Sequence, residues 1–211
     1  MGFGTYARTV RDERLPSARR HSALRCAVGL YRPLGFHATW AYLAATAVPA
    51  PDMRRDTGAL LRALDVLEAS RAVRLREVAA FAERRRGEKA AGRRTPRAAD
   101  TAPFRGPRWP GDTAPSRLGL VAAVANRHAA FRRLPPPDDA PLADLHARLD
   151  SCALSYLAHL GDAPTPDDSL ADALASIRHA PFRMHLLPWL RFADLLVYAT
   201  TASGQVPRSL G

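Results

Sequence analysis

Residues 57–86 read TGALLRALDVLEASRAVRLREVAAFAERRR, and this stretch decides the fold class. An apolar stripe at helical spacing runs along it through Leu60, Leu64, Leu67, Leu75, Val78 and Phe81. The three consecutive arginines at its end, residues 84–86, complement the negative end of a helix dipole. We therefore predict one long helix that ends at Arg86 and begins at about Asp52 or Thr57. As a unit of the chain, we assign residues 57–86 to this connecting helix.

Helical periodicity also precedes this stretch. Ser17 is suited to cap the N-terminus of a first helix, and Gly35 stands where a glycine ends many helices. A second, short segment covers residues 38–47, and prolines break the chain after it. We assign residues 17–56 to a small N-terminal helical unit and residues 1–16 to an N-terminal tail.

Residues 87–116 differ in kind, because glycines and prolines interrupt them too often for a helix or a strand. Five arginines lie among these residues: Arg93, Arg94, Arg97, Arg105 and Arg108. We predict a flexible, disordered basic linker that binds partners without sequence choice. Its two large apolar side chains, Phe104 and Trp109, dock either onto the rest of the protein or onto a partner.

Residues 117–203 return to helical periodicity, and we predict a C-terminal helical bundle followed by a tail at residues 204–211. The last segment, from Pro181 to about Ala202, is apolar nearly all round, so it must be buried on several sides. It is either the central helix of the bundle or the carrier of a dimer interface. The second interpretation assigns that interface to Leu186, Trp189, Leu190 and Leu196. The whole chain is thus expected to be all-α, a helical bundle with a disordered Arg/Pro/Gly-rich central loop.

The chain of 211 residues carries a formal net charge of +11, from 31 basic and 20 acidic residues. All the basic residues except Lys89 are arginines. A GC-rich genome accounts for arginine in place of lysine, whereas the excess of bases over acids favours an anionic partner. Nucleic acid, DNA first, is the commonest such partner, because phosphate binding releases counterions. An acidic protein surface and an anionic membrane stay open.

No run of about 18 apolar residues predicts a transmembrane helix, and the charged start of the chain is unlike a secretory signal. Cys26 and Cys152 are the only cysteines, and both lie among small apolar residues, which fits two thiols in a reducing compartment. We therefore expect a cytoplasmic location, or a nuclear one if the source is eukaryotic or viral.

The sequence holds none of the common catalytic motifs, such as nucleophile elbows, phosphate-binding loops or dinucleotide fingerprints. Its seven histidines never adopt a zinc-ligand spacing. We interpret His146 and Asp150 as a surface hydrogen-bonding pair, and Arg191 and Asp194 as a structural ion pair in the apolar last helix. We expect no enzyme activity, no metal and no cofactor.

Residues 19–39 read RRHSALRCAVGLYRPLGFHAT and begin with a basic pair. A helix pattern follows in Ala23, Leu24, Cys26, Ala27, Leu30 and Tyr31, and a turn pattern in Gly35, Phe36, Ala38 and Thr39. Together with residues 56–64, DTGALLRAL, these positions resemble the helix-turn-helix opening of the TetR-type transcriptional regulators. The resemblance covers the N-terminal part of the chain only.

The resemblance implies a homodimer that places a recognition helix in the major groove of DNA, with a pocket for a small-molecule effector behind it. It implies DNA contacts from Arg19, Arg20, Thr39, Arg54 and Arg55. The chain is shorter than the family pattern here, because Pro49 and Pro51 leave only residues 52–55 for a recognition helix.

Two functions from different classes follow. The first is a divergent DNA-binding transcriptional regulator of TetR type. The second is a non-enzymatic helical interaction or scaffold protein, viral or accessory, whose basic segment 84–108 binds nucleic acid or an acidic partner. A continuous helix from Asp52 to Arg86 would argue against the regulator, and a break near residues 56–58 would favour it. A pocket with convergent charged groups would revive a third candidate, an enzyme.

Overall fold

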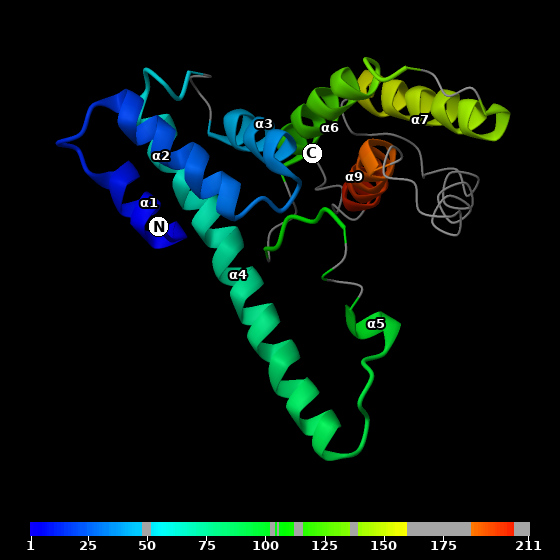
Figure 1. The fold of residues 1–211 in the computed structure, drawn as a ribbon. Helices are drawn as coiled ribbons and strands as arrows, with labels where there is room; N and C mark the ends of the chain where they lie inside the picture. Colours follow the sequence, from blue (N-terminus) through cyan, green and yellow to red (C-terminus); the bar gives the residue numbers. More distant parts are fainter. Residues whose placement is uncertain are drawn as a thin grey trace, which may run out of the picture.

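The computed structural model describes residues 1–47, 52–101, 104, 106–111, 116–135, 139–159 and 187–204. Its helices, in chain order, are α1 (Phe3–Arg11), α2 (Ser17–Leu30), α3 (Phe36–Thr46), α4 (Thr57–Ala90), α5 (Ala98–Thr101), α6 (Arg117–Phe131), α7 (Ala140–Ala158) and α9 (Leu187–Gly204) (Figure 1). No strand occurs within these described ranges, and the all-α prediction is confirmed. Within the same ranges, no helix is both long enough and apolar enough to cross a bilayer.

The predicted N-terminal tail is wrong, because residues 3–11 form α1. Phe3, Ala7 and Val10 recur at helical spacing and are buried against α2 and α4. At the end of the helix, the Arg11 guanidinium pairs with Asp65 of α4 at 2.6 Å and with Glu68 at 2.7 Å. The exposed Arg8 and Arg11 therefore belong to a packed helix.

The long helix α4 begins at Thr57, the second of the two starting positions that the sequence predicts. The Asp56 carboxylate caps it by accepting a hydrogen bond from the Ala59 amide at 3.1 Å. The helix runs on to Ala90, four residues past the predicted end, because Gly87 is accommodated within it. Its first half is buried through Ala59, Leu60, Ala63, Leu64, Leu67 and Ser70, whereas Arg85 is the only buried described residue beyond that.

This difference divides the molecule into two regions. We call residues 71–101 the arm, and α1, α2, α3, residues 57–70, α6, α7 and α9 the body. In Figure 1 the second half of α4 extends away from the other helices, and the short helix α5 lies on the chain that returns from its tip. The predicted split into an N-terminal unit and a C-terminal bundle does not hold, because α3 packs closely against α6.

Gly119 makes the approach of α3 and α6 possible. A Cβ atom at this position would lie 2.6 Å from the Tyr42 ring and 2.9 Å from the Thr46 methyl group. The Tyr42 hydroxyl also accepts a hydrogen bond from the Ser116 amide at 2.9 Å, just before α6 begins. The N-terminal and C-terminal helices therefore share one core.

Helix α9 closes this core from the C-terminal side. Phe192, Leu195 and Leu196 are buried, and the Phe131 ring of α6 lies 4.7 Å from that of Phe192. Trp189 is buried in the same cluster, so the predicted dimer interface is wrong for Trp189 and Leu196, which one chain covers by itself. Leu190 is half-buried, and Leu186 lies outside the described residues. The interpretation of this segment as a central helix is the one that the burial supports.

The predicted pair of His146 and Asp150 does not form. Asp150 instead accepts from His128 of α6 at 2.7 Å, while the His146 ring stacks on Phe131 with 4.4 Å between centroids. The physical reason is the packing of α6 on α7, which offers each side chain a partner on the neighbouring helix. The His128–Asp150 pair thus joins two helices.

Candidate nucleic-acid interface

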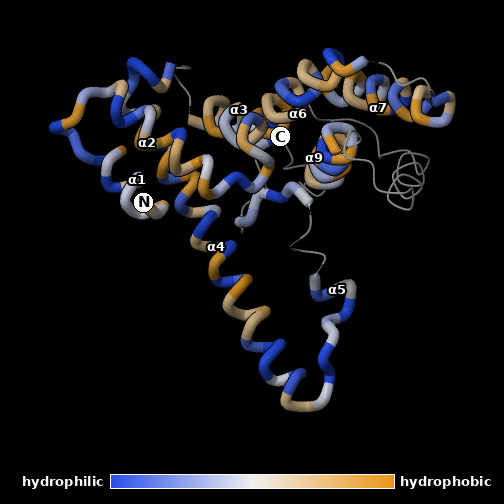
Figure 2. The backbone as a smooth tube through the Cα atoms, viewed as in Figure 1, coloured by the Kyte–Doolittle hydropathy of each residue, from blue (hydrophilic) through white to orange (hydrophobic). Residues whose placement is uncertain are grey.

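The arm holds a large part of the positive charge of the chain. Between Arg71 and Thr101 the sequence has ten basic and four acidic residues. Figure 2 shows hydrophilic residues around the far end of α4 and along the returning segment. Because few apolar side chains of the arm are buried, its conformation must be held by polar contacts.

The tip of the arm is a defined helix end. Gly92 has a φ of +85°, a left-handed conformation that glycine adopts without steric cost. Its amide donates to the Lys89 carbonyl at 3.0 Å, and the Arg93 amide donates to the Glu88 carbonyl at 2.8 Å. This pair of hydrogen bonds is the Schellman arrangement, which ends a helix and turns the chain away from its axis.

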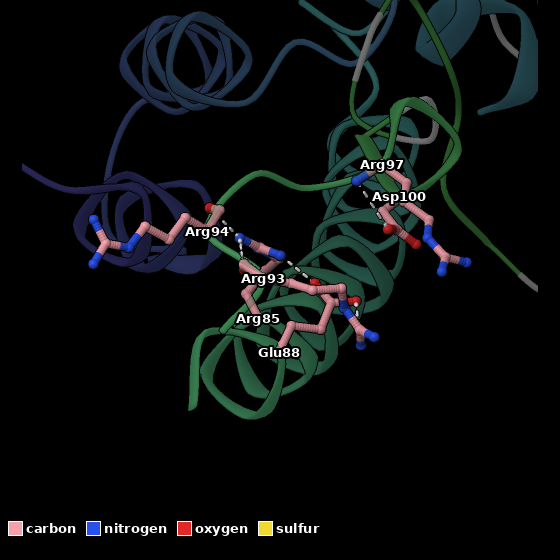
Figure 3. A network of polar contacts seen from close by, with 6 residues as sticks. All are labelled: Arg85, Glu88, Arg93, Arg94, Arg97 and Asp100. Atoms are coloured by element: carbon pink, nitrogen blue, oxygen red, sulfur yellow. Dashed lines mark hydrogen bonds and ion pairs between the residues drawn. The ribbon is translucent and has the colours of Figure 1, made fainter. Parts of the chain in front are cut away.

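Arg85 fixes the chain after that turn (Figure 3). Its side chain is only 8% exposed and forms an ion pair with Glu88. One terminal nitrogen also donates to the carbonyl oxygens of Arg94 at 2.6 Å and Arg93 at 3.3 Å. A single buried guanidinium thus ties the returning residues to α4, and we call this network the Arg85 clamp.

Further along the returning chain, aromatic and ionic contacts hold it in place. The Phe104 ring lies 4.9 Å from the Phe81 ring, with the Arg74 guanidinium 4.4 Å from the Phe104 centroid. Arg108 forms an ion pair with Glu77 of α4. The described parts of the predicted linker are therefore anchored at several points along the helix.

Trp109 attaches the end of this chain to the body. Its ring stacks on Tyr42 with 4.1 Å between centroids, and its amide donates to the Tyr198 hydroxyl at 3.0 Å. Burial raises the pKa values of both tyrosines, which keeps their hydroxyls neutral and able to hydrogen-bond. Of the two predicted docking places for Trp109, the body is the one observed.

The clamp and these anchors leave a set of exposed cations on the outside of the arm: Arg76, Arg84, Lys89, Arg94 and Arg97. Within the part of the chain that the structure describes, none of the five side chains forms an ion pair with a carboxylate. Figure 3 shows the side chains of Arg94 and Arg97 pointing away from the clamp. The arm thus presents positive charge outward on a fixed backbone.

The arginines of the predicted linker differ in exposure and in ion pairing. Arg93, Arg94 and Arg97 are exposed, and Arg93 lies 3.9 Å from a Glu88 oxygen. Arg108 is half-buried in its ion pair with Glu77, and Arg105 lies outside the described residues. The exposed three are the ones available to a partner.

Two of the five DNA contacts implied by the family resemblance are wrong. Arg20 is 4% exposed and donates from Nε to the Val10 carbonyl at 2.7 Å, which fastens α2 to the end of α1. Thr39 is fully buried, and its hydroxyl accepts a hydrogen bond from the Leu34 amide at 3.1 Å. Neither side chain reaches solvent, because each one satisfies backbone groups inside the body.

Arg19, Arg54 and Arg55 are exposed, as a role in binding requires. The pKa of His21 in α2 is lowered by burial first, and then by the positive charges of Arg54 and Arg25 nearby. The same corner holds Trp40, whose ring lies 5.2 Å from His21. This corner of α2 and α3 is a second, smaller basic surface.

The break at Asp56 is the feature that was expected to favour the regulator. In front of it, residues 53–55 form turns, closed by hydrogen bonds from the Arg55 and Asp56 amides to the Asp52 carbonyl. No recognition helix is present in residues 52–56, and residues 48–51 lie outside the described ranges. The stretches of sequence that carry the predicted resemblance form α2, the Gly35 turn, the first residues of α3 and the start of α4.

Comparison of the chain with known proteins finds no matching family model, no matching curated protein and no matching solved structure. The TetR-type resemblance accordingly stays a prediction. Among the described residues, no group of three or more His, Cys, Asp or Glu side chains could hold a metal ion.

Sequence reasoning missed the Arg85 clamp. Arg85 stands between Arg84 and Arg86 and is identical to them in type, so nothing local marks it as the buried one. One signal was present: Gly92 follows α4 by two positions, where a Schellman turn would send the chain back past the last helical turns.

Proposed function

We propose that this protein binds nucleic acid through the arm, by contact between its exposed cations and the phosphate backbone. The observation that carries the proposal is the Arg85 clamp, which buries one arginine in order to hold the chain bearing Arg93, Arg94 and Arg97 against α4. Cations that are held on a defined backbone lose less entropy when they meet a phosphate than cations on a disordered chain.

The chemistry of the arm fits a polyphosphate better than a protein carboxylate surface. Its cations are almost all arginines, whose planar guanidinium forks match phosphate oxygens in pairs. They lie along an extended helix and its returning chain, a shape that follows a backbone of regularly spaced charge (Figure 1). Phosphate contacts of this kind carry no sequence information, so we expect similar affinity for duplexes of different sequence.

The test is fluorescence anisotropy with a labelled duplex over a salt series. The arm variant carries Arg84→Gln, Lys89→Gln and Arg94→Gln, and the control carries Arg8→Gln, Arg14→Gln and Arg133→Gln. All six side chains are exposed, so both variants lose the same charge at no cost in packing. Each lost phosphate contact lowers the slope of log affinity against log salt by about 0.9. We expect a slope lower by about 2.7 for the arm variant and a small change for the control.

Equal losses in the two variants would mean that net charge alone attracts DNA, and the arm would have no role of its own. Absence of binding to any duplex or single strand, together with binding to an acidic protein, would overturn the nucleic-acid proposal in favour of a protein partner.

A second candidate is the TetR-type regulator, supported by the exposed corner where Arg54 and Arg25 gather around His21 and Trp40. It is tested in the same assay with the duplex upstream of the gene and a scrambled duplex. A preference of about a thousandfold, lost in Arg54→Gln with Arg55→Gln but kept in the arm variant, would support the regulator. Equal binding to both duplexes would remove it.

A further inference from the structure

A pocket of about 520 Å³ opens between the N-terminal and C-terminal helices, on a part of the body that the proposed function does not use. Its described lining comes from the turn between α2 and α3, from residues 106–107 on the returning chain, from Arg127 on α6, and from Arg191 and Asp194 on α9. Four separate segments thus converge on it. Its volume lies in the range of small-molecule sites.

Positive charge dominates this pocket. Arg32, Arg127 and Arg191 line it, and Asp194 is the only acidic side chain among its described lining residues. Within the described part of the chain, none of the three arginines forms an ion pair with a carboxylate. Arg127 is half-buried, and its pKa is lowered by burial first and by the neighbouring Arg191 charge second. Two guanidinium groups, those of Arg127 and Arg191, thus lie close enough for their charges to interact, and an anion that enters the cavity would offset their repulsion.

The start of α3 adds backbone donors to the same pocket. Gly35 precedes this helix with a φ of +85° and a ψ of 156°, a conformation essentially restricted to glycine. No side chain caps the helix, so its first amides, at Phe36 and His37, have no capping acceptor among the described residues. Both residues line the pocket. The positive end of the helix dipole therefore supports the three arginines.

We propose that this pocket binds a small organic phosphate, with the phosphate group held by Arg32, Arg127 and Arg191. Three guanidinium forks from different segments of the chain surround a tetrahedral dianion better than a planar carboxylate. The cavity exceeds the size of one phosphate group, and Pro33, Leu34, Phe36 and Pro107 supply an apolar wall for the rest of the molecule. A phosphomonoester with an aromatic or apolar body matches both parts.

The experiment is calorimetric titration of the full chain with AMP, phenyl phosphate, inorganic phosphate and adenosine. We expect AMP and phenyl phosphate to bind with a Kd below about 1 mM, inorganic phosphate to bind at least about tenfold more weakly, and adenosine not to bind. Arg127→Gln should weaken AMP by about tenfold or more, the size of one lost charge-assisted contact. Arg127→Lys keeps the positive charge but lacks the planar guanidinium, so its affinity for AMP should lie between that of the parent protein and that of Arg127→Gln.

The matched control is Arg133→Gln, an exposed arginine in the turn just after the same helix, which does not line the pocket and should leave AMP affinity unchanged. Equal binding of AMP and adenosine, or an Arg127→Gln protein that binds AMP as well as the parent, would overturn the proposal. So would the absence of binding by both phosphomonoesters.

Two further measurements separate this pocket from the arm. The arm variant should bind AMP as well as the parent protein does, even if the parent protein binds no duplex. Arg127→Gln should bind duplex DNA as well as the parent protein does, even if the parent protein binds no AMP. If Arg127→Gln weakens duplex binding as strongly as it weakens AMP, and the duplex displaces AMP, the pocket holds a backbone phosphate of nucleic acid. That result would overturn the small-molecule ligand.

Discussion

The two halves of α4 belong to one unbroken helix, yet they are stabilised in different ways. Residues 57–70 lie beneath α1, α2 and α3 and bury leucines and alanines at helical spacing. Residues 71–90 bury one side chain, Arg85, and expose Leu75 and Val78. Apolar burial therefore stabilises the body, whereas ion pairs, hydrogen bonds and ring contacts shape the arm.

The comparison shows that one apolar stripe at helical spacing can be buried in a core along one half of a helix and exposed along the other. The apolar stripe of the first half continues into the second, where the Phe104 ring of the returning chain lies against Phe81 and Leu75 and Val78 are exposed. A helix that begins inside a packed body can continue into solvent because the costly first turns are already formed there.

The strongest test of this contrast compares two leucines on α4. Leu64 is fully buried, so Leu64→Ala should cost about 2–5 kcal/mol of unfolding free energy. Leu75 is 49% exposed, and Leu75→Ala should change it by about 0.5 kcal/mol or less. Urea unfolding of both variants measures the difference. Similar losses in the two would mean that a surface of the arm is covered in solution.

The second test addresses the joint between α3 and α6. Gly119→Ala would place a Cβ atom 2.6 Å from the Tyr42 ring, and the forced repacking should cost about 1–3 kcal/mol. Better helix propensity returns about 1 kcal/mol, so the net loss is small but measurable. Gly29→Ala in α2 is the control, because nothing lies within 4 Å of its added Cβ and the protein should gain stability. Equal effects at both positions would contradict the close α3–α6 contact.

The third test removes the clamp without touching the body. Arg85→Gln takes away the ion pair with Glu88 and the donors to the Arg93 and Arg94 carbonyls. We expect amide hydrogen exchange at residues 92–94 to accelerate by about tenfold or more, a local opening, while exchange in residues 59–67 stays unchanged. Arg84→Gln is the matched control, one position away and exposed. Unchanged exchange in Arg85→Gln would show that the Schellman turn alone holds the tip.

The smallest expected effect is a pH dependence at the corner of α2 and α3. The pKa of His21 in the folded protein lies below its ordinary value of 6.5. Below about pH 6.5, His21 therefore binds a proton more readily in the unfolded chain than in the folded one. Stability should therefore fall as the pH decreases from about 7 to about 5.5, and less so in His21→Gln. Urea midpoints at the two pH values measure it. An identical pH dependence in both proteins would exclude His21 as its source.

Much of the fold could be predicted from the sequence. The predicted bounds of α2, α3 and α4 lie within a few residues of the observed ones. They rest on the helical spacing of Leu60, Leu64 and Leu67, on Gly35, and on the breaks before residue 57. The prediction failed for α1, because three buried apolar residues, Phe3, Ala7 and Val10, give a weak periodic signal in so short a helix. It also missed the close contact of α3 and α6, because the sequence around Gly119 does not indicate which side chain packs against that glycine.

The candidate sites were harder to predict, because arginine serves opposite purposes in this chain. Arg20 and Arg85 are buried and donate to backbone carbonyls, while Arg19 and Arg84, their immediate neighbours, are exposed. Residue type and local sequence do not distinguish them. The pocket between α3, α6 and α9 joins residues far apart in the sequence, and only the packing brings their charges together.

The length of the exposed half of α4 sets the reach of the protein. Twenty residues of α-helix, 71–90, rise by about 30 Å, and one turn of B-form DNA advances by about 34 Å. A duplex lying along this rod would meet the cations at the tip and those near the body almost one turn apart, on the same side of the double helix. Inserting eleven residues, about three helical turns, would lengthen the rod by about 16 Å, close to half a turn of such a duplex, and would bring the tip toward its opposite side.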